Sequence, residues 1–219
     1  MAYMGESWIR RRQMEQRTQQ ILHSALELFY EKGIDDTSIE EVAKAANVGT
    51  ATIYRYFETK AELAISVGIV YWQEIADKYI GMMLQEEYRG LCGSRQLQQI
   101  FIILEKVLEE ESLFLRFLQE FDIFVRKYKI SKERLNDYEE KILNLKPYMT
   151  DALKKGLNDG SLYFSYNIDE VYFSVMHTML SLMQKLSYNG SMLLSDEIVK
   201  PALQLRIAGG LLLKGLGAE

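Results

Sequence analysis

Apolar side chains recur at helical spacing in the first part of the chain. One stripe of a predicted helix carries five of them, namely Ile21, Leu22, Ala25, Leu26 and Phe29. Gly33 follows, and glycine commonly ends helices because it adopts the left-handed conformation without steric cost. Since no segment alternates apolar and polar residues between turn signals, the pattern predicts an all-helical (all-α) fold.

Two shorter helices are expected next. Thr37 and Glu40 have the spacing of a capping box, which predicts a helix over 38–46. The turn-forming sequence Asn-Val-Gly at 47–49 then leads into a short helix over 50–56. Two helices joined by a turn of three to four residues have the geometry of a helix-turn-helix.

Longer helical segments follow the third short helix. They are predicted at approximately 60–88, 94–110, 112–129, 132–158, 168–188 and 196–216. Pro201 cannot continue a helix begun before it, so the last long helix is expected to start there. The pattern predicts an N-terminal three-helix domain with its arm over 1–60 and a larger helical domain over 61–219, with about nine helices.

The net charge argues against nucleic acid at first, because it is −5 and phosphate binding depends on clustered Lys and Arg. Residues 1–60 hold eight Lys and Arg against nine Asp and Glu, so the case for DNA rests on placement. Arg10, Arg11, Arg12 and Arg17 precede or open the first helix. They are candidates for an arm along the DNA backbone, with a disordered basic tail as the alternative.

Several classes of protein are not expected. The single cysteine, Cys92, forms no intramolecular disulfide, and no Cys/His cluster has the spacing of metal ligands, so we expect no metal and no cofactor. His23 and His177 lie far apart along the chain, and no catalytic constellation accompanies them, so we expect no enzyme. No apolar stretch is long enough to cross a bilayer, which favours a cytoplasmic location and no membrane contact.

The segment from Gly33 to Leu63 closely resembles the N-terminal domain of the tetracycline-repressor (TetR) family. The resemblance covers roughly residues 15–65 and rests on an ordered set of positions: Gly33, Thr37, Val42-Ala43, Ala46-x-Val48, Tyr54-x-Tyr56-Phe57 and Lys60. Two departures touch the recognition turn: Gly49 replaces the usual serine, and Thr-Ala-Thr-Ile-Tyr at 50–54 replaces the usual Gly-x-x-Tyr.

The resemblance implies a homodimer that places one recognition helix of each subunit in successive major grooves of a double-stranded DNA operator. By position, it makes Thr37 and Tyr54 phosphate contacts and Lys60 a phosphate clamp at the start of a helix. The residues expected to line the groove are Thr50, Ala51, Thr52, Arg55 and Tyr56.

The resemblance also implies that the larger domain senses a small-molecule effector and forms the dimer. Five residues are expected to contact an apolar or aromatic effector, namely Trp72, Phe117, Phe121, Tyr172 and His177. A filled core is the alternative to a cavity. Residues 168–216 look like the dimer interface, in which Met176, Leu180 and Met183 form one apolar seam.

The sequence therefore predicts a DNA-binding regulator, specifically a repressor that leaves its operator when the effector binds. Two other functions remain open. One is a regulator controlled by a protein partner, and the other is a helical binding protein with a vestigial DNA-binding head.

Overall fold

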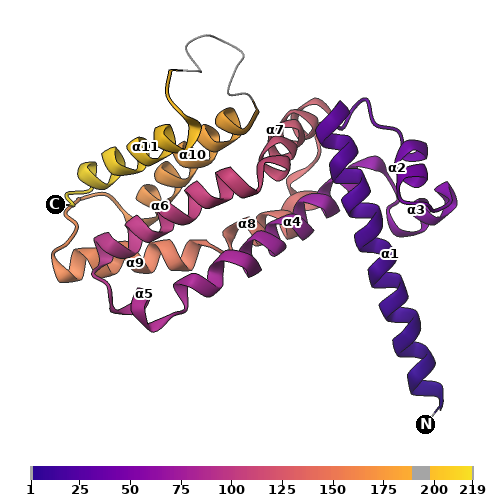
Figure 1. Cartoon of the computed structure of the whole chain (residues 1–219), viewed down its shortest axis with the longest axis horizontal. Coiled ribbons are helices and arrows are strands. Elements are labelled where there is room, and N and C mark those ends of the chain that lie inside the picture. The colour runs from indigo at the N-terminus through magenta and orange to yellow at the C-terminus, as the bar shows by residue number, and fades with distance from the viewer. Residues whose placement is uncertain (1, 189–197, 219) are drawn as a thin grey trace. The chain divides into compact units, whose positions relative to one another are not determined.

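All regular elements are helical in the part of the chain that the computed structural model describes, residues 2–188 and 198–218. The α-helices there are α1 (Ala2–Lys32), α2 (Ile39–Ala45), α3 (Thr50–Tyr56), α4 (Lys60–Met83), α5 (Glu86–Gly90), α6 (Gly93–Glu110), α7 (Ser112–Lys127), α8 (Asn136–Leu143), α9 (Lys146–Asp159), α10 (Ile168–Tyr188) and α11 (Pro201–Gly215), and a short 3-10 helix spans Lys132–Leu135 (Figure 1). The prediction of an all-helical fold with an N-terminal helix-turn-helix is confirmed.

The chain forms two compact units. The first comprises the residues up to Tyr71 together with Phe117–Tyr138, and the second comprises Trp72–Arg116 together with the residues from Glu139 onwards. Helices α4, α7 and α8 each contribute one part to each unit. The predicted boundary at residue 60 separates a DNA-binding segment from a sensing segment. The two compact units are defined by packing and not by function, so this boundary stays a prediction.

The first unit contains the predicted first helix with its apolar stripe inside. Its five stripe residues are at most 2% exposed, and Gly33 ends α1 with a φ of +83°. The predicted capping box is wrong by one residue, because Ser38 caps α2 and exchanges hydrogen bonds with Glu41. Thr37 is instead buried, and its hydroxyl donates to the Gly33 carbonyl at 2.8 Å.

The turn between α2 and α3 forms as its residues predict. Asn47 adopts a φ of +51°, and Gly49 precedes the first residue of α3 in an extended conformation. Ile53 and Phe57 are buried against the small core, as their spacing predicts. Helix α3 therefore keeps one face on the core and exposes the rest.

Aromatic rings from α7 also belong to the first unit. The Phe117 ring stacks on Phe29 with centroids 6.2 Å apart, and Phe121 lies 5.5 Å from Phe117. Tyr138 continues this row 4.9 Å from Phe121. Gly68 of α4 leaves room for the Tyr138 ring, which a Cβ at that position would overlap. These rings form part of the buried core of the first unit.

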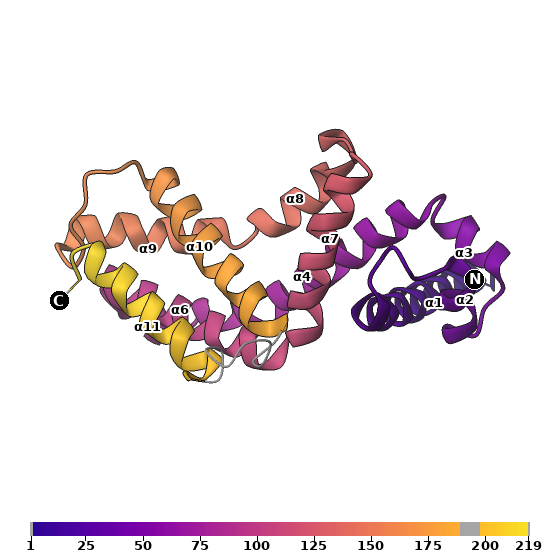
Figure 2. The same ribbon diagram turned by 90° about the horizontal axis from the view of Figure 1, so that it is seen from above.

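The second unit is built around α6, which packs against α9, α10 and α11 (Figure 2). Glycine at position 93 allows α6 and α9 to approach closely, since a Cβ there would overlap the backbone of Gly156. The single helix predicted over 132–158 is wrong, since α9 begins at Lys146 with Pro147 in its first turn, where proline fits best. Pro201 opens α11, which confirms the prediction for the last helix.

Candidate DNA-binding surface and ligand cavity

The side chains predicted to read DNA lie together on α3. Ala51, Tyr54 and Arg55 are exposed, while Thr50, Thr52 and Tyr56 are half-buried. The Arg55 guanidinium carbon lies 5.2 Å from the centroid of the Tyr56 ring, a cation–π distance that orients the guanidinium without consuming its hydrogen-bond donors. The helix therefore presents hydroxyls, a cationic fork and aromatic rings on its solvent side.

The two other predicted contacts, Thr37 and Lys60, point inward. Thr37 is only 1% exposed, so its hydroxyl does not reach the surface. The Lys60 ammonium donates to the carbonyl oxygens of Asp35 at 2.8 Å and Thr37 at 3.2 Å. Both residues thus hold the loop before α2 against the start of α4. An ammonium has three N–H groups, so Lys60 retains one donor after these two bonds.

Two carboxylates near the helix-turn-helix are neutralised by lysines. Glu41 pairs with Lys32, and this hydrogen bond together with those from Ser38 lowers the pKa of Glu41 to about 2. Asp35 accepts a hydrogen bond from Lys127 at 2.7 Å, which holds the pKa of Asp35 below its usual range. Arg55 of α3 stays exposed. Lys127, which lies outside residues 1–60, therefore adds a positive charge that offsets one carboxylate of this region.

The arginines before the apolar stripe lie on α1 as a helical extension. Arg11, Arg12 and Arg17 are exposed, and the Arg12 guanidinium carbon lies 5.4 Å from the centroid of the Trp8 ring. The side chain of Arg10 lies outside what the structure describes. The basic residues are therefore carried by a helix, which differs from the disordered tail considered as an alternative.

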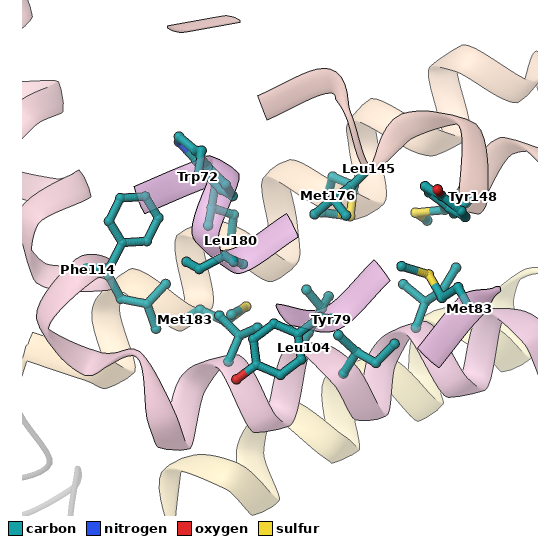
Figure 3. Close-up of a pocket in the computed structure, with 16 residues that line it drawn as sticks. Trp72, Tyr79, Met83, Leu104, Phe114, Leu145, Tyr148, Met176, Leu180 and Met183 are labelled. Atoms are coloured by element: carbon teal, nitrogen blue, oxygen red, sulfur yellow. The ribbon is translucent and has the colours of Figure 1, made fainter. Parts of the chain in front are cut away.

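The second unit encloses an apolar cavity of about 50 Å³ (Figure 3). Its lining comes from α4, α6, α7, α9, α10 and the residue before α9: Trp72, Ile75, Tyr79, Met83, Ile100, Ile103, Leu104, Val107, Phe114, Leu115, Leu145, Tyr148, Met149, Met176, Leu180 and Met183. In Figure 3, Trp72 and Phe114 lie at one end and Met83 and Tyr148 at the other.

Few polar atoms border this cavity. The Tyr79 hydroxyl donates to a carboxylate oxygen of Glu110 at 2.9 Å, and burial together with this carboxylate raises the pKa of Tyr79 to about 12. The Trp72 ring packs edge-on against Phe114 at 5.2 Å, and its buried Nε1 has no hydrogen-bond partner. The lining thus suits an apolar molecule, because it holds no charged side chain that could pair with a charged group of a ligand.

A second feature of this unit is an apolar face on α10 and α11. Its exposed side chains are Phe173, Leu203, Ile207 and Leu211. Gly210 lies on the same side of α11, where a Cβ would meet no other atom, whereas Gly209 faces inward against Phe101. A groove of about 310 Å³ beside this face is lined in part by Tyr166, Val175 and Leu211.

The helix-turn-helix matches a family of bacterial regulators. Residues 21–67, which run from α1 into α4, match the family described as bacterial regulatory proteins, tetR family. Residues 21–67 are thus a helix-turn-helix domain of the tetR family. The match covers the segment on which the sequence resemblance rests.

Relatives in this family share mainly the N-terminal part. The HTH-type transcriptional regulator AcrR of Shigella flexneri is 34% identical over 99 residues, which cover 45% of this chain and 43% of that protein. The chain spans only 26% to 43% of the length of AcrR and two other curated relatives, YuxN of Bacillus subtilis and TcmR of Streptomyces glaucescens.

Solved structures share the fold over nearly the whole chain. The fatty acid degradation regulator FadR of Bacillus halodurans covers 93% of this chain with 97% of its own, at 20% identity and a TM-score of 0.66. FadR of Bacillus subtilis in complex with stearoyl-CoA has a TM-score of 0.60 at 17% identity, covering 90% of this chain and 98% of its own. RolR in complex with resorcinol has a TM-score of 0.57 at 18% identity, covering 95% of this chain and 91% of its own.

Of the five residues predicted to contact an effector, the structure places only Trp72 in the cavity lining. Phe117 and Phe121 belong to the ring stack of the first unit. Tyr172 is buried beside Phe173, with ring centroids 5.0 Å apart, and does not line the cavity. His177 was expected to face the interior, but it is exposed beside Phe173 on the outer face.

Helical geometry explains the change on α10. Met176, Leu180 and Met183 follow one another by four and three residues and line the cavity, so the adjacent His177 turns away from it. The expected outer seam of Met176, Leu180 and Met183 is therefore wrong. The same period on α4 would have found the missed lining residues, since Ile75, Tyr79 and Met83 share a face with Trp72.

No helix in residues 2–188 and 198–218 has the length and apolar character to cross a membrane. No group of three or more His, Cys, Asp or Glu side chains there is arranged to hold a metal ion.

Proposed function

We propose that this chain is a DNA-binding transcriptional regulator that reads its operator with α3. The observation that carries the proposal is the solvent side of α3, where exposed Arg55 and half-buried Tyr56 extend from a helix-turn-helix of the tetR family. An Arg fork can donate two hydrogen bonds to a guanine edge, and hydroxyls such as those of Thr50 and Thr52 reach phosphates or bases. Operator DNA lies in the bacterial cytoplasm, so a cytoplasmic location follows.

Lys60 and Tyr54 are proposed to position the protein on the DNA backbone. Tyr54 is half exposed, so its hydroxyl is available to a phosphate oxygen. Lys60 keeps one N–H for a phosphate and stands at the first residue of α4, where the helix dipole also favours an anion. Thr37 supports this site through its buried hydrogen bond and not through a direct contact.

The dimer is proposed to form through the outer face of α10 and α11, within residues 168–216, of which 189–197 lie outside the described residues. Phe173, Ile207 and Leu211 present apolar area to solvent in a single subunit. A two-fold axis would bury the same patch on both subunits, and Gly210 allows the helices to approach closely.

The cavity of the second unit is proposed to hold a small apolar or aromatic effector whose binding releases the protein from DNA. Its apolar lining supports such a ligand. FadR with stearoyl-CoA and RolR with resorcinol are neighbours in fold that hold small molecules. Helix α4 runs without a break from Lys60 of the first unit to the cavity residues Trp72–Met83 of the second, which offers a covalent route for coupling.

The test begins with selection of bound sequences from a random double-stranded DNA library. The selected site is then titrated with the chain and with Arg55→Ala, which should lose ~1–3 kcal/mol of binding free energy and relax preference at one base position. Arg95→Ala, a matched exposed arginine of α6, should bind as the unchanged chain does. If no sequence is enriched, the vestigial-head alternative is favoured. Release by a protein but by no small molecule would favour control by a protein partner.

A further inference from the structure

The cavity of the second unit has lining residues spread along α4. Its α4 lining residues Trp72, Ile75, Tyr79 and Met83 form one stripe along the helix. Met83 follows Trp72 by eleven residues, so this stripe extends over roughly 16 Å of helix axis. The volume along this length is only about 50 Å³. For comparison, a compact apolar cavity of about 150 Å³ takes up benzene. A ring therefore has no preformed place here.

Flexible side chains are distributed along the cavity. Met83, Met149, Met176 and Met183 all contribute to the lining. Methionine is unbranched and repacks at low cost, whereas the Trp72 and Phe114 rings in edge-on contact move only as rigid plates. A thin molecule needs a small shift from each methionine along the length, while a ring needs a large widening at one place. The distribution of methionines thus favours a thin, extended molecule.

One end of the cavity adjoins a polar surface groove. Met83 and Tyr148 line both the cavity and this groove, whose volume is about 270 Å³. Arg89, Gln96 and Asp151 supply the polar side chains of the groove. At the opposite end, Trp72 and Phe114 close the cavity with apolar rings (Figure 3). The two ends therefore differ in polarity.

We propose that the cavity binds a single-chain amphiphile, with an unbranched alkyl chain lying along α4 toward Trp72 and a polar head at the groove behind Met83 and Tyr148. This inference rests on the proposed function for its regulatory meaning, but binding itself can be measured without DNA. It narrows the apolar or aromatic effector to aliphatic chains and excludes fused aromatic rings as preferred ligands.

The experiment uses 1-alkanols from 1-hexanol to 1-tetradecanol as probes, with 2-naphthol as a compact aromatic of the same carbon number as 1-decanol. The chain has two tryptophans, so Trp8→Phe, at an exposed position of α1, leaves Trp72 as the only indole reporter. Binding is followed by the emission of Trp72 and by calorimetry. Affinity should rise about fourfold with each added methylene.

The rise should level off at roughly twelve carbons, when the chain spans the roughly 16 Å between Met83 and Trp72. Leu180→Phe narrows the middle of the cavity and should move this limit to shorter chains. Leu180→Ala widens it and should strengthen 2-naphthol binding more than 1-decanol binding. Thermal melting first checks that both variants are folded. The chain-length series uses the unchanged lining, so its result does not depend on either variant.

Two results would overturn the inference. The first is 2-naphthol binding as tightly as 1-decanol, and the second is no saturable binding of any alkanol. In either case, the proposed function would still hold if a molecule of another kind lowered the affinity for operator DNA. Conversely, alkanols that bind with the expected length dependence but leave operator affinity unchanged would retain this inference and contradict the proposed release from DNA.

Discussion

Lys60 combines an observed structural role with a proposed contact to DNA. Its ammonium joins the start of α4 to the carbonyls of Asp35 and Thr37, at 2.8 and 3.2 Å. Hydrogen bonds from a charged donor stabilise a fold by ~1.5–3 kcal/mol in favourable cases. The same ammonium has one donor left for a phosphate. A substitution at this position is therefore expected to affect both the loop and the proposed DNA contact.

We expect Lys60→Ala to lower the free energy of unfolding by ~1–3 kcal/mol, since two carbonyls lose their donor. We also expect the slope of log affinity against log salt for DNA to fall by about 1, since one phosphate contact is lost. Denaturant titration measures the first effect, and binding at several salt concentrations measures the second. Lys44→Ala, an exposed lysine of α2, is the control for general charge. An unchanged salt slope would restrict Lys60 to its structural role.

At the scale of elements, α2 depends on a capping box. Ser38 accepts from the Glu41 amide at 3.1 Å, and Glu41 accepts from the Ser38 amide at 2.9 Å. The hydrogen bond from Lys32, followed by those from Ser38, lowers the pKa of Glu41 to about 2 from an ordinary value of 4.5. A depressed pKa means that the ionised carboxylate stabilises the fold above pH 4.5, and that this contribution is lost as the pH falls from 4.5 toward 2.

We expect Ser38→Ala to cost ~1 kcal/mol of unfolding free energy, because it removes the N-cap acceptor. Glu41→Gln should lower the melting temperature at pH 7, and its difference from the unchanged chain should shrink between pH 4.5 and 2. Thermal melts across this pH range check the result. Glu40→Gln, on the exposed side of α2, serves as the matched control. A difference independent of pH would show that the Glu41 charge is not the source.

The elements also show what sequence reasoning reaches and where it stops. Periodicity and caps predict α1, α2, α3 and the start of α11, because those signals are local. The register of the α2 cap was off by one, since Thr37 and Ser38 are both good caps and only the loop packing decides between them. The side of α10 that faces inward was misassigned because apolar residues occur on both of its faces, as Phe173 and Met176 show.

Non-local packing is the part that sequence reasoning missed. Phe117 lies 88 positions after Phe29 along the chain, yet their rings stack in one core. No local pattern distinguishes Phe117 from Phe114 on the same helix, although Phe114 lines the cavity of the second unit. To predict whether Phe117 and Phe121 line the cavity, one must therefore know which part of α7 belongs to which unit.

At the scale of the whole molecule, the apolar face on α10 and α11 predicts dimerisation. Ile207→Glu and Leu211→Glu each place a charge where the partner subunit would bury an exposed apolar side chain. Each should convert the dimer at micromolar concentration to a monomer of 25.5 kDa in sedimentation. Leu157→Glu, at an exposed leucine of α9, should remain dimeric. Unchanged sedimentation of all three variants would place the interface elsewhere.

The final prediction concerns the coupling of effector and DNA through α4. A ligand shifts an equilibrium only by its different affinity for the two states, so a hundredfold loss of operator affinity requires about 2.7 kcal/mol of coupling. Helix α4 carries Lys60 and the cavity residues Trp72 and Met83 on one continuous backbone. Gln73 lies next to the boundary between the units and is half-buried outside the cavity lining.

A glycine at this position destabilises the helix by ~1 kcal/mol relative to alanine, because its backbone is less restricted. We therefore expect Gln73→Gly to bind operator and 1-decanol separately with nearly unchanged affinities but to lose much of the effect of one on the other. Gln73→Ala removes the same side chain and its hydrogen bond to Asp77 while keeping the helix stiff, so its coupling should persist. Operator titrations with and without 1-decanol measure both variants. Equal coupling in the two would exclude α4 stiffness as the route and direct attention to α7 and α8, which also contribute to both units.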